Sequence, residues 1–95
     1  GAVEAAIAGL AGVSQCVVVG LDHPERGEEV CAVVVPSDPG IDIAEVAAYA
    51  RTQLSAYKVP TRWVLTGSDR IPTLASGKFD RLTLRSKIID GSLQA

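Results

Sequence analysis

Apolar residues recur along the chain with two different periods, and the change of period predicts the elements of the fold. Val3, Ile7 and Leu10 stand at helical spacing, so a short first helix is expected. Gly12 follows as its stop. The runs SQCVVVGL and EEVCAVVV are β-branched and of strand length, with DHPERG between them. They predict an antiparallel pair that is apolar on both faces, central in a sheet and covered by helices.

The middle of the chain contains the most regular helical pattern. After the breaker PSDPG, Asp42 and Glu45 form an N-cap and capping-box pair. Behind them apolar residues recur at helical spacing: Ile43, Val46, Ala47, Ala50 and Leu54.

Three further segments complete the expected order. TRWVLT predicts a third strand, GSDRIPTLASGK (67–78) a long polar loop, and FDRLTLRSKII a closing amphipathic helix. The expected fold is α+β, with a small mixed or antiparallel three-stranded sheet packed with about three helices in the order α-β-β-α-β-α.

Composition and charge narrow the class of protein. The chain has 95 residues, 47% of them apolar and 21% charged, and its net charge is -2. This indicates one globular domain, without the basic surplus that nucleic acid requires. No apolar run approaches the roughly 20 residues of a transmembrane helix, and GAVEAAIAGL lacks the features of a signal peptide. A cytoplasmic protein with no nucleic-acid partner and no transmembrane segment is expected.

The thiols and the single imidazole do not indicate a metal site. Cys16 and Cys31 lie within apolar runs, so buried free thiols are expected. His23 lies in the turn-like DHPERG and is expected to be a solvated loop residue rather than a catalytic base. Zinc would need two more ligands at suitable spacing, so we expect no metal site.

The stretch PTLASGKFDR places Lys78 on the long polar loop, directly behind Ser76 and Gly77. A solvated lysine near a helix N-terminus is one interpretation. A Walker-type phosphate loop is excluded twice, because Pro72 stands where a glycine is needed and Phe79 where Ser or Thr is needed. A third interpretation is a mobile lysine that reaches an anionic transition state on another surface and stabilises its charge.

The same residues resemble a known superfamily. PTLASGKFDR is similar to the last motif of the adenylate-forming enzymes, which include acyl-CoA synthetases, luciferases and peptide-synthetase adenylation domains. LSAYKVP (54–60) resembles their preceding motif, VVVGLDHPERGEEVCAVVV their strand, turn and strand, and AVEAAIAGLAGV the helix after their hinge. The four matches occur in the family's order between about residues 2 and 86. One departure is Leu74, where the motif usually has threonine.

Within the superfamily, AYKVP and SGK resemble the CoA ligases more than the peptide-synthetase domains, whereas the pair Asp80-Arg81 leans the other way. The leading hypothesis is therefore part of an ATP-dependent acid-CoA ligase, which forms acyl-AMP and then acyl-CoA. A peptide-synthetase fragment and a non-catalytic protein-binding module of the same fold are the alternatives.

The resemblance implies that residues 1–95 are one C-terminal lid domain. A large N-terminal domain, in the same or a separate chain, would hold ATP, Mg and the carboxylic acid. That domain, its acyl pocket and the hinge would lie outside this chain, which would be an excised fragment or half of a split enzyme.

The resemblance also implies roles for individual residues. Lys78 would meet the carboxylate and the α-phosphate during adenylation, after which the lid would rotate to admit CoA. Ser76 and Gly77 would support the loop, with Gly77 permitting a close approach. Arg81 would brace the loop or the helix start, and Lys58 is a candidate for a CoA phosphate.

Two expectations concern the isolated chain. Residues 2–89 should fold alone, because the helices can cover both faces of the strands. The chain alone should be inactive and bind neither ATP nor another cofactor tightly, since its sequence has no glycine-rich phosphate cradle and no acidic pair placed for Mg.

Overall fold

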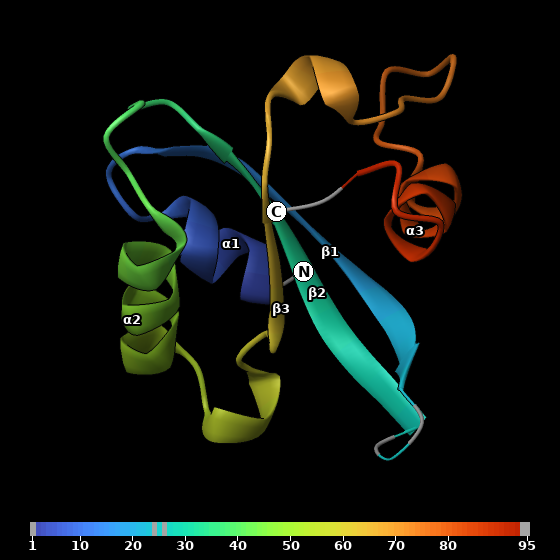
Figure 1. Cartoon of the computed structure of the whole chain (residues 1–95). Helices are drawn as coiled ribbons and strands as arrows, with labels where there is room; N and C mark the ends of the chain where they lie inside the picture. The colour runs from blue at the N-terminus through green and yellow to red at the C-terminus, as the bar shows by residue number, and fades with distance from the viewer. Residues whose placement is uncertain (1, 24, 26, 94–95) are drawn as a thin grey trace.

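The fold has the predicted order of helices and strands (Figure 1). The computed structural model describes residues 2–23, 25 and 27–93. Its elements are α1 (Ala2–Ala8), β1 (Val13–His23), β2 (Gly27–Pro36), α2 (Ile43–Gln53), the 3₁₀ helix η1 (Ala56–Lys58), β3 (Arg62–Leu65), the 3₁₀ helix η2 (Ser68–Arg70) and α3 (Arg81–Ile89). The predicted α+β class and the order α-β-β-α-β-α are confirmed.

The sheet is mixed, with the strand order β1-β2-β3. β1 runs antiparallel to β2, with Val17 opposite Val33. β3 runs parallel to β2, with Val64 opposite Val33. α2 lies between these two parallel strands in the sequence and provides the crossover that parallel pairing requires. The prediction that both apolar strands are central is wrong for β1, which is an edge strand.

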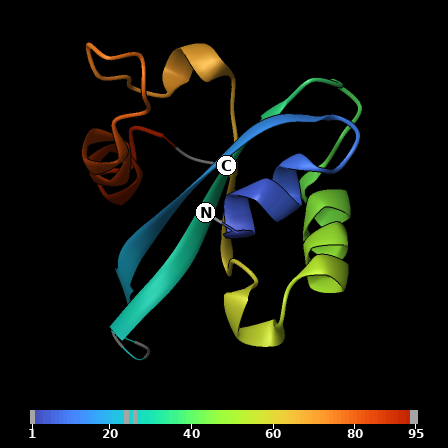
Figure 2. The same cartoon turned by 180° about the vertical axis from the view of Figure 1, so that it is seen from behind.

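Helices cover both faces of the sheet, as Figures 1 and 2 show. Side chains alternate along each strand, so the strands contribute to two separate apolar clusters. Val17, Val33 and Val64 pack with Leu84 and Ile88 of α3. The opposite face of the sheet packs against α1 and α2 through Ala32, Val34, Ile7, Val46 and Ala50.

The start of α2 follows the predicted capping pattern. Asp42 is the N-cap residue, and its side-chain oxygen accepts a hydrogen bond of 2.9 Å from the amide of Glu45. This bond satisfies one of the amides that a helix N-terminus leaves without an intrahelical partner. The predicted N-cap is thus confirmed.

The two cysteines are free, as predicted, but they are not equally buried. Cys31 is 0% exposed and belongs to the cluster against α3, whereas Cys16 is partly buried on the opposite face. Burial raises the pKa of Cys16 to about 12 and that of Cys31 to about 11. Neither thiol is therefore a thiolate nucleophile near neutral pH.

The strands extend further into the DHPERG segment than predicted. His23 ends β1 and pairs with Gly27, so its backbone belongs to a strand and not to the loop. The exposure predicted for the His23 side chain lies outside the described part of the structure, as do Pro24 and Arg26. Among the described residues, no helix combines the length and apolar character needed to cross a membrane.

The core extends past residue 89, the end expected for the folded unit. Leu93 is 2% exposed and joins the cluster against α3. Its amide donates a hydrogen bond of 3.1 Å to the carbonyl of Lys87. A chain cut at residue 89 would lose this buried side chain, so the folded unit extends at least to Leu93.

Two leucines of α3 provide a matched test of how this helix packs against the sheet. Leu84 is 0% exposed and Leu82 is 80% exposed. We expect Leu84→Ala to lower the free energy of unfolding by about 2–5 kcal/mol, since it leaves a cavity in the core. Leu82→Ala should change it by no more than about 0.5 kcal/mol. Urea denaturation of the isolated chain measures both, and equal losses would contradict the packing of α3.

Candidate functional site at the lysine hairpin

The segment predicted as a long polar loop is folded over most of its length. Residues 68–70 form η2, and Thr73 pairs with Phe79 in an antiparallel bridge. Lys78 therefore lies on a tight hairpin of residues 73–79, which we call the lysine hairpin. The segment contains no α-helix and no strand of the sheet, so the predicted loop is confirmed, and its turn determines the position of Lys78.

The turn of the lysine hairpin is closed by two backbone hydrogen bonds. The amide of Gly77 donates to the carbonyl of Leu74 at 2.9 Å, and the amide of Leu74 donates to the carbonyl of Lys78 at 2.7 Å. Gly77 has a φ of 89°, which matches the left-handed glycine of a three-residue hairpin loop.

The conformation of the backbone is what requires glycine at position 77. No other atom lies within 4 Å of the place that a Cβ on Gly77 would occupy. The close approach expected at Gly77 concerns a site on another domain and stays a prediction. Lys78 and Ser76, on either side, are both exposed.

The lysine hairpin continues directly into α3. The amide of Asp80 donates to the carbonyl of Pro72 at 2.8 Å and so joins the two ends of the hairpin. The Asp80 carboxylate caps α3, accepting hydrogen bonds from the amide of Thr83 at 3.1 Å and from its hydroxyl at 2.7 Å. These two bonds from Thr83 lower the pKa of Asp80. The cap thereby fixes the start of α3 next to Lys78.

Arg81, the first residue of α3, forms an ion pair with Glu4 of α1. Its Nη2 atom lies 2.9 Å from Glu4 Oε1 and 2.8 Å from Oε2. Glu4 Oε2 also accepts a hydrogen bond of 2.9 Å from the amide of Val18 on β1. Burial by itself would raise the pKa of Glu4, but the hydrogen bonds that it accepts outweigh burial and lower that pKa.

Lys58 is not part of the same site. It ends η1, which precedes β3, whereas the lysine hairpin follows β3 and η2. Figure 1 shows η1 and the hairpin at opposite ends of β3. Lys58 is exposed, and its ammonium nitrogen lies 5.8 Å from the centre of the Tyr57 ring. The structure thus brings together Ser76, Gly77, Lys78 and Arg81 and leaves Lys58 apart.

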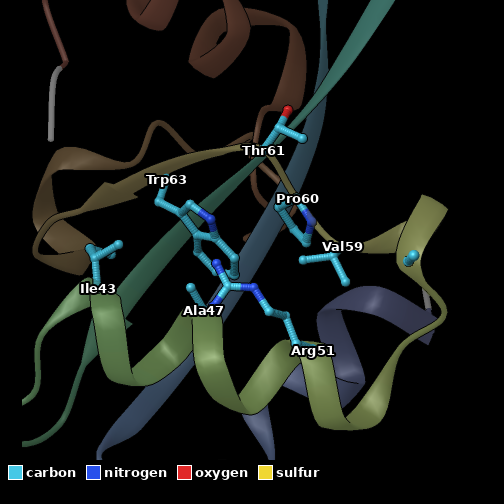
Figure 3. Close-up of a pocket in the computed structure, with 8 residues that line it drawn as sticks. Ile43, Ala47, Arg51, Val59, Pro60, Thr61 and Trp63 are labelled. Atoms are coloured by element: carbon cyan, nitrogen blue, oxygen red, sulfur yellow. The ribbon is translucent and has the colours of Figure 1, made fainter.

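A groove that the sequence did not predict lies between α2 and the segment from η1 to β3 (Figure 3). Its volume is about 580 Å³, and its lining is mostly apolar: Ile43, Ala47, Arg51, Ala56, Val59, Pro60, Thr61 and Trp63. Ile43 and Ala47 belong to the predicted apolar face of α2. The sequence did not show which residues of the rest of the chain would lie opposite them. The half-buried Trp63 of β3 is the sequence signal for this surface.

The described residues do not supply the ligand sets that metal ions need. In residues 2–23, 25 and 27–93, no group of three or more His, Cys, Asp or Glu side chains could hold a metal ion. The carboxylates next to the lysine hairpin have other roles, since Asp80 caps α3 and Glu4 binds Arg81.

The fold and the lysine hairpin define a class of protein. A mixed sheet between helices is the fold that the resemblance to adenylate-forming enzymes implies for their C-terminal domain. The sequence profile of the AMP-binding enzyme C-terminal domain matches residues 2–78, and the chain belongs to this family.

Individual relatives cover nearly the whole chain. A feruloyl-CoA synthase of Amycolatopsis is 47% identical over 78 residues, which are 81% of this chain and 16% of that protein. A linear gramicidin synthase of Brevibacillus parabrevis is 37% identical over 88% of this chain and 1% of its own length. A fatty acyl CoA synthetase structure from Mycobacterium tuberculosis superposes with a TM-score of 0.85 and 29% identity, covering 95% of this chain and 18% of that one. The chain thus spans a small part of each relative.

The left-handed backbone at Gly77 leads to a prediction about stability. Gly77→Ala should lower the free energy of unfolding by about 1–2 kcal/mol, since a Cβ is disfavoured in this region. Gly77→Asn should cost less, because asparagine adopts this conformation more readily than alanine. Thermal unfolding of the isolated chain measures both, with Ser76→Ala as the control at the neighbouring exposed position. Equal stability of Gly77→Ala and Ser76→Ala would show that the turn does not need glycine.

Proposed function

We propose that this chain is the C-terminal domain of an ATP-dependent acid-CoA ligase, in which it supplies Lys78 to the adenylation step. The observation that carries the proposal is the exposed Lys78 on its closed hairpin, at the last residue of the family match. Membership of the family and the relatives that are CoA synthetases support it.

The proposed reaction has two steps. A carboxylate oxygen attacks the α-phosphorus of ATP, and pyrophosphate leaves with the electron pair of the broken P–O bond. The thiol of CoA, losing its proton, then attacks the acyl carbon of the acyl-AMP, and AMP leaves. The ammonium group of Lys78 would donate hydrogen bonds to the carboxylate and to the α-phosphate in the first step. A positioned cation stabilises the negative charge on the oxygens of a phosphoryl-transfer transition state.

The binding of the reactants is assigned to a partner domain. We propose that a large N-terminal domain, on the same or a separate chain, holds ATP with its magnesium ion and the carboxylic acid. Lys78 would enter that site as the whole C-terminal domain moves, since backbone hydrogen bonds join the hairpin to α3. The two free thiols suit a reducing compartment, so a cytoplasmic location is part of the proposal.

Lys58 is assigned to the second step. It lies at the other end of β3 from the lysine hairpin, and its exposed ammonium group suits a phosphate of CoA. The two lysines, one before β3 and one on the hairpin after η2, would serve two orientations of the domain, one for each step. Arg81 would brace the start of α3 rather than contact substrate.

The two lysines can be separated in the intact ligase that contains this chain. Lys78→Ala should lower the rate of pyrophosphate release by about 10² to 10³, the usual loss when one positioned charge donor is removed. Lys58→Ala is the control and should leave pyrophosphate release unchanged, while it slows transfer of the acyl group from preformed acyl-AMP to CoA. An unchanged rate of adenylation in Lys78→Ala would refute the proposed function.

The isolated chain should bind Mg-ATP weakly and should not adenylate an acid. A lysine stabilises charge only after the reactants are held in line, and this orientation can account for about 7–11 kcal/mol of a barrier. Calorimetric titration of the isolated chain with Mg-ATP measures the affinity. A dissociation constant in the low micromolar range would reveal a nucleotide site in this domain and contradict the division of labour proposed here.

A further inference from the structure

We infer that Glu4 is a positioning residue for adenylation: through Arg81 it holds the lysine hairpin in place relative to the sheet. This inference rests on the proposed function of Lys78. Glu4 lies far from the lysine in the sequence and is not part of the motif that contains it. Its contacts connect three elements, namely α1, edge strand β1 and the start of α3.

The ion pair has the geometry of a specific contact. One nitrogen of the Arg81 guanidinium lies within 2.9 Å of both carboxylate oxygens of Glu4. The Glu4 side chain is 16% exposed, whereas that of Arg81 is 54% exposed. The Glu4 side chain is thus partly buried while that of Arg81 faces solvent, so water screens the ion pair less than a fully exposed pair.

The Glu4 carboxylate is itself fixed to the sheet. In an antiparallel pair alternate amides of an edge strand point away from the partner strand, and that of Val18 donates to Glu4 Oε2 at 2.9 Å. Because this bond holds the carboxylate on β1, Arg81 is bound to a fixed point and not to a freely rotating side chain. The ion pair thus holds the start of α3 in a fixed position relative to edge strand β1.

An arginine at the first position of α3 does not stabilise the helix itself. Arg81 is the first residue of α3, and a cation at a helix N-terminus interacts unfavourably with the helix dipole. The capping of α3 is already provided by Asp80. The ion pair to Glu4 is the only hydrogen-bonded side-chain contact of Arg81 that is recorded among the described residues, so its effect is to connect α3 to α1 and β1.

A displacement of Arg81 would be transmitted to Lys78. Arg81 follows Asp80, whose amide bonds to Pro72 at the base of the hairpin, and the hairpin is closed by the bond from Leu74 to Lys78. These short backbone bonds leave little freedom between the helix start and the lysine. A small error in the placement of a reacting group can lower a rate strongly, since a misplacement of about 1 Å can cost about 10²-fold.

The test uses the intact ligase and both half-reactions. We expect Glu4→Gln and Arg81→Gln each to lower the rate of pyrophosphate release by about tenfold. The double variant should lose no more than either single variant, because the two side chains act as one pair. Acyl transfer from preformed acyl-AMP to CoA should remain unchanged, since Lys78 acts only in adenylation. A purely structural role would not separate the two half-reactions.

Arg85→Gln is the matched control. Arg85 lies on the same helix and also binds β1, with Nε 2.8 Å from the carbonyl of Gly20 and Nη2 3.3 Å from Asp22. Its loss should leave pyrophosphate release unchanged, because it lies further along α3 from the lysine hairpin. Thermal unfolding of each variant checks that the domain remains folded, and the more exposed Arg81 provides the test if Glu4→Gln unfolds.

Four results would overturn the inference. Equal losses in both half-reactions would show that the pair is only structural, and a loss in Arg85→Gln as large as in Arg81→Gln would show that any contact between α3 and β1 suffices. Unchanged adenylation in Glu4→Gln and Arg81→Gln, with Lys78→Ala strongly impaired, would refute the role of Glu4 alone. Unchanged adenylation in Lys78→Ala would instead refute the proposed function, and the inference with it.

Discussion

The fold depends on the burial of both faces of β2. Every residue from Cys31 to Val35 is buried, and successive side chains of a strand point to opposite faces. Each face must therefore be covered, one by α3 and the other by α1 and α2. The chain has to cross from one face to the other after β3, and the lysine hairpin lies on this crossing (Figure 2). The location of the candidate site thus follows from the layering of the domain.

The apolar periods of the sequence predict the elements because they report burial directly. They do not report how many neighbours a strand has, which is why β1 reads as central although it lies at the edge. The pattern of apolar residues does not predict the hairpin around Lys78 either. Its turn depends on one glycine with positive φ and two backbone bonds, and neither leaves an alternation of apolar and polar residues.

The candidate site was predictable only as far as the motif extends. Ser76, Gly77, Lys78 and Arg81 are close in the sequence and remain close in the structure. The partner of Arg81 is Glu4, at a separation of 77 residues, and no local pattern connects the two. The groove beside Trp63 was missed for the same reason, because its walls come from α2 and from the segment around β3. Tertiary contacts of this kind follow from the packing of the layers.

Glu4 also affects how the domain behaves among other molecules of its kind. A sheet with exposed edges can pair with the strands of neighbouring molecules, and natural proteins protect such edges with charges and with short strands. β3 spans only residues 62–65, whereas β1 spans residues 13–23 and is the longer edge. The Glu4 carboxylate accepts a hydrogen bond from the Val18 amide in the middle of that edge and places a negative charge there. The side chain that binds Arg81 thus also places a charge at the long edge of the sheet, a feature that disfavours pairing with a strand of another molecule.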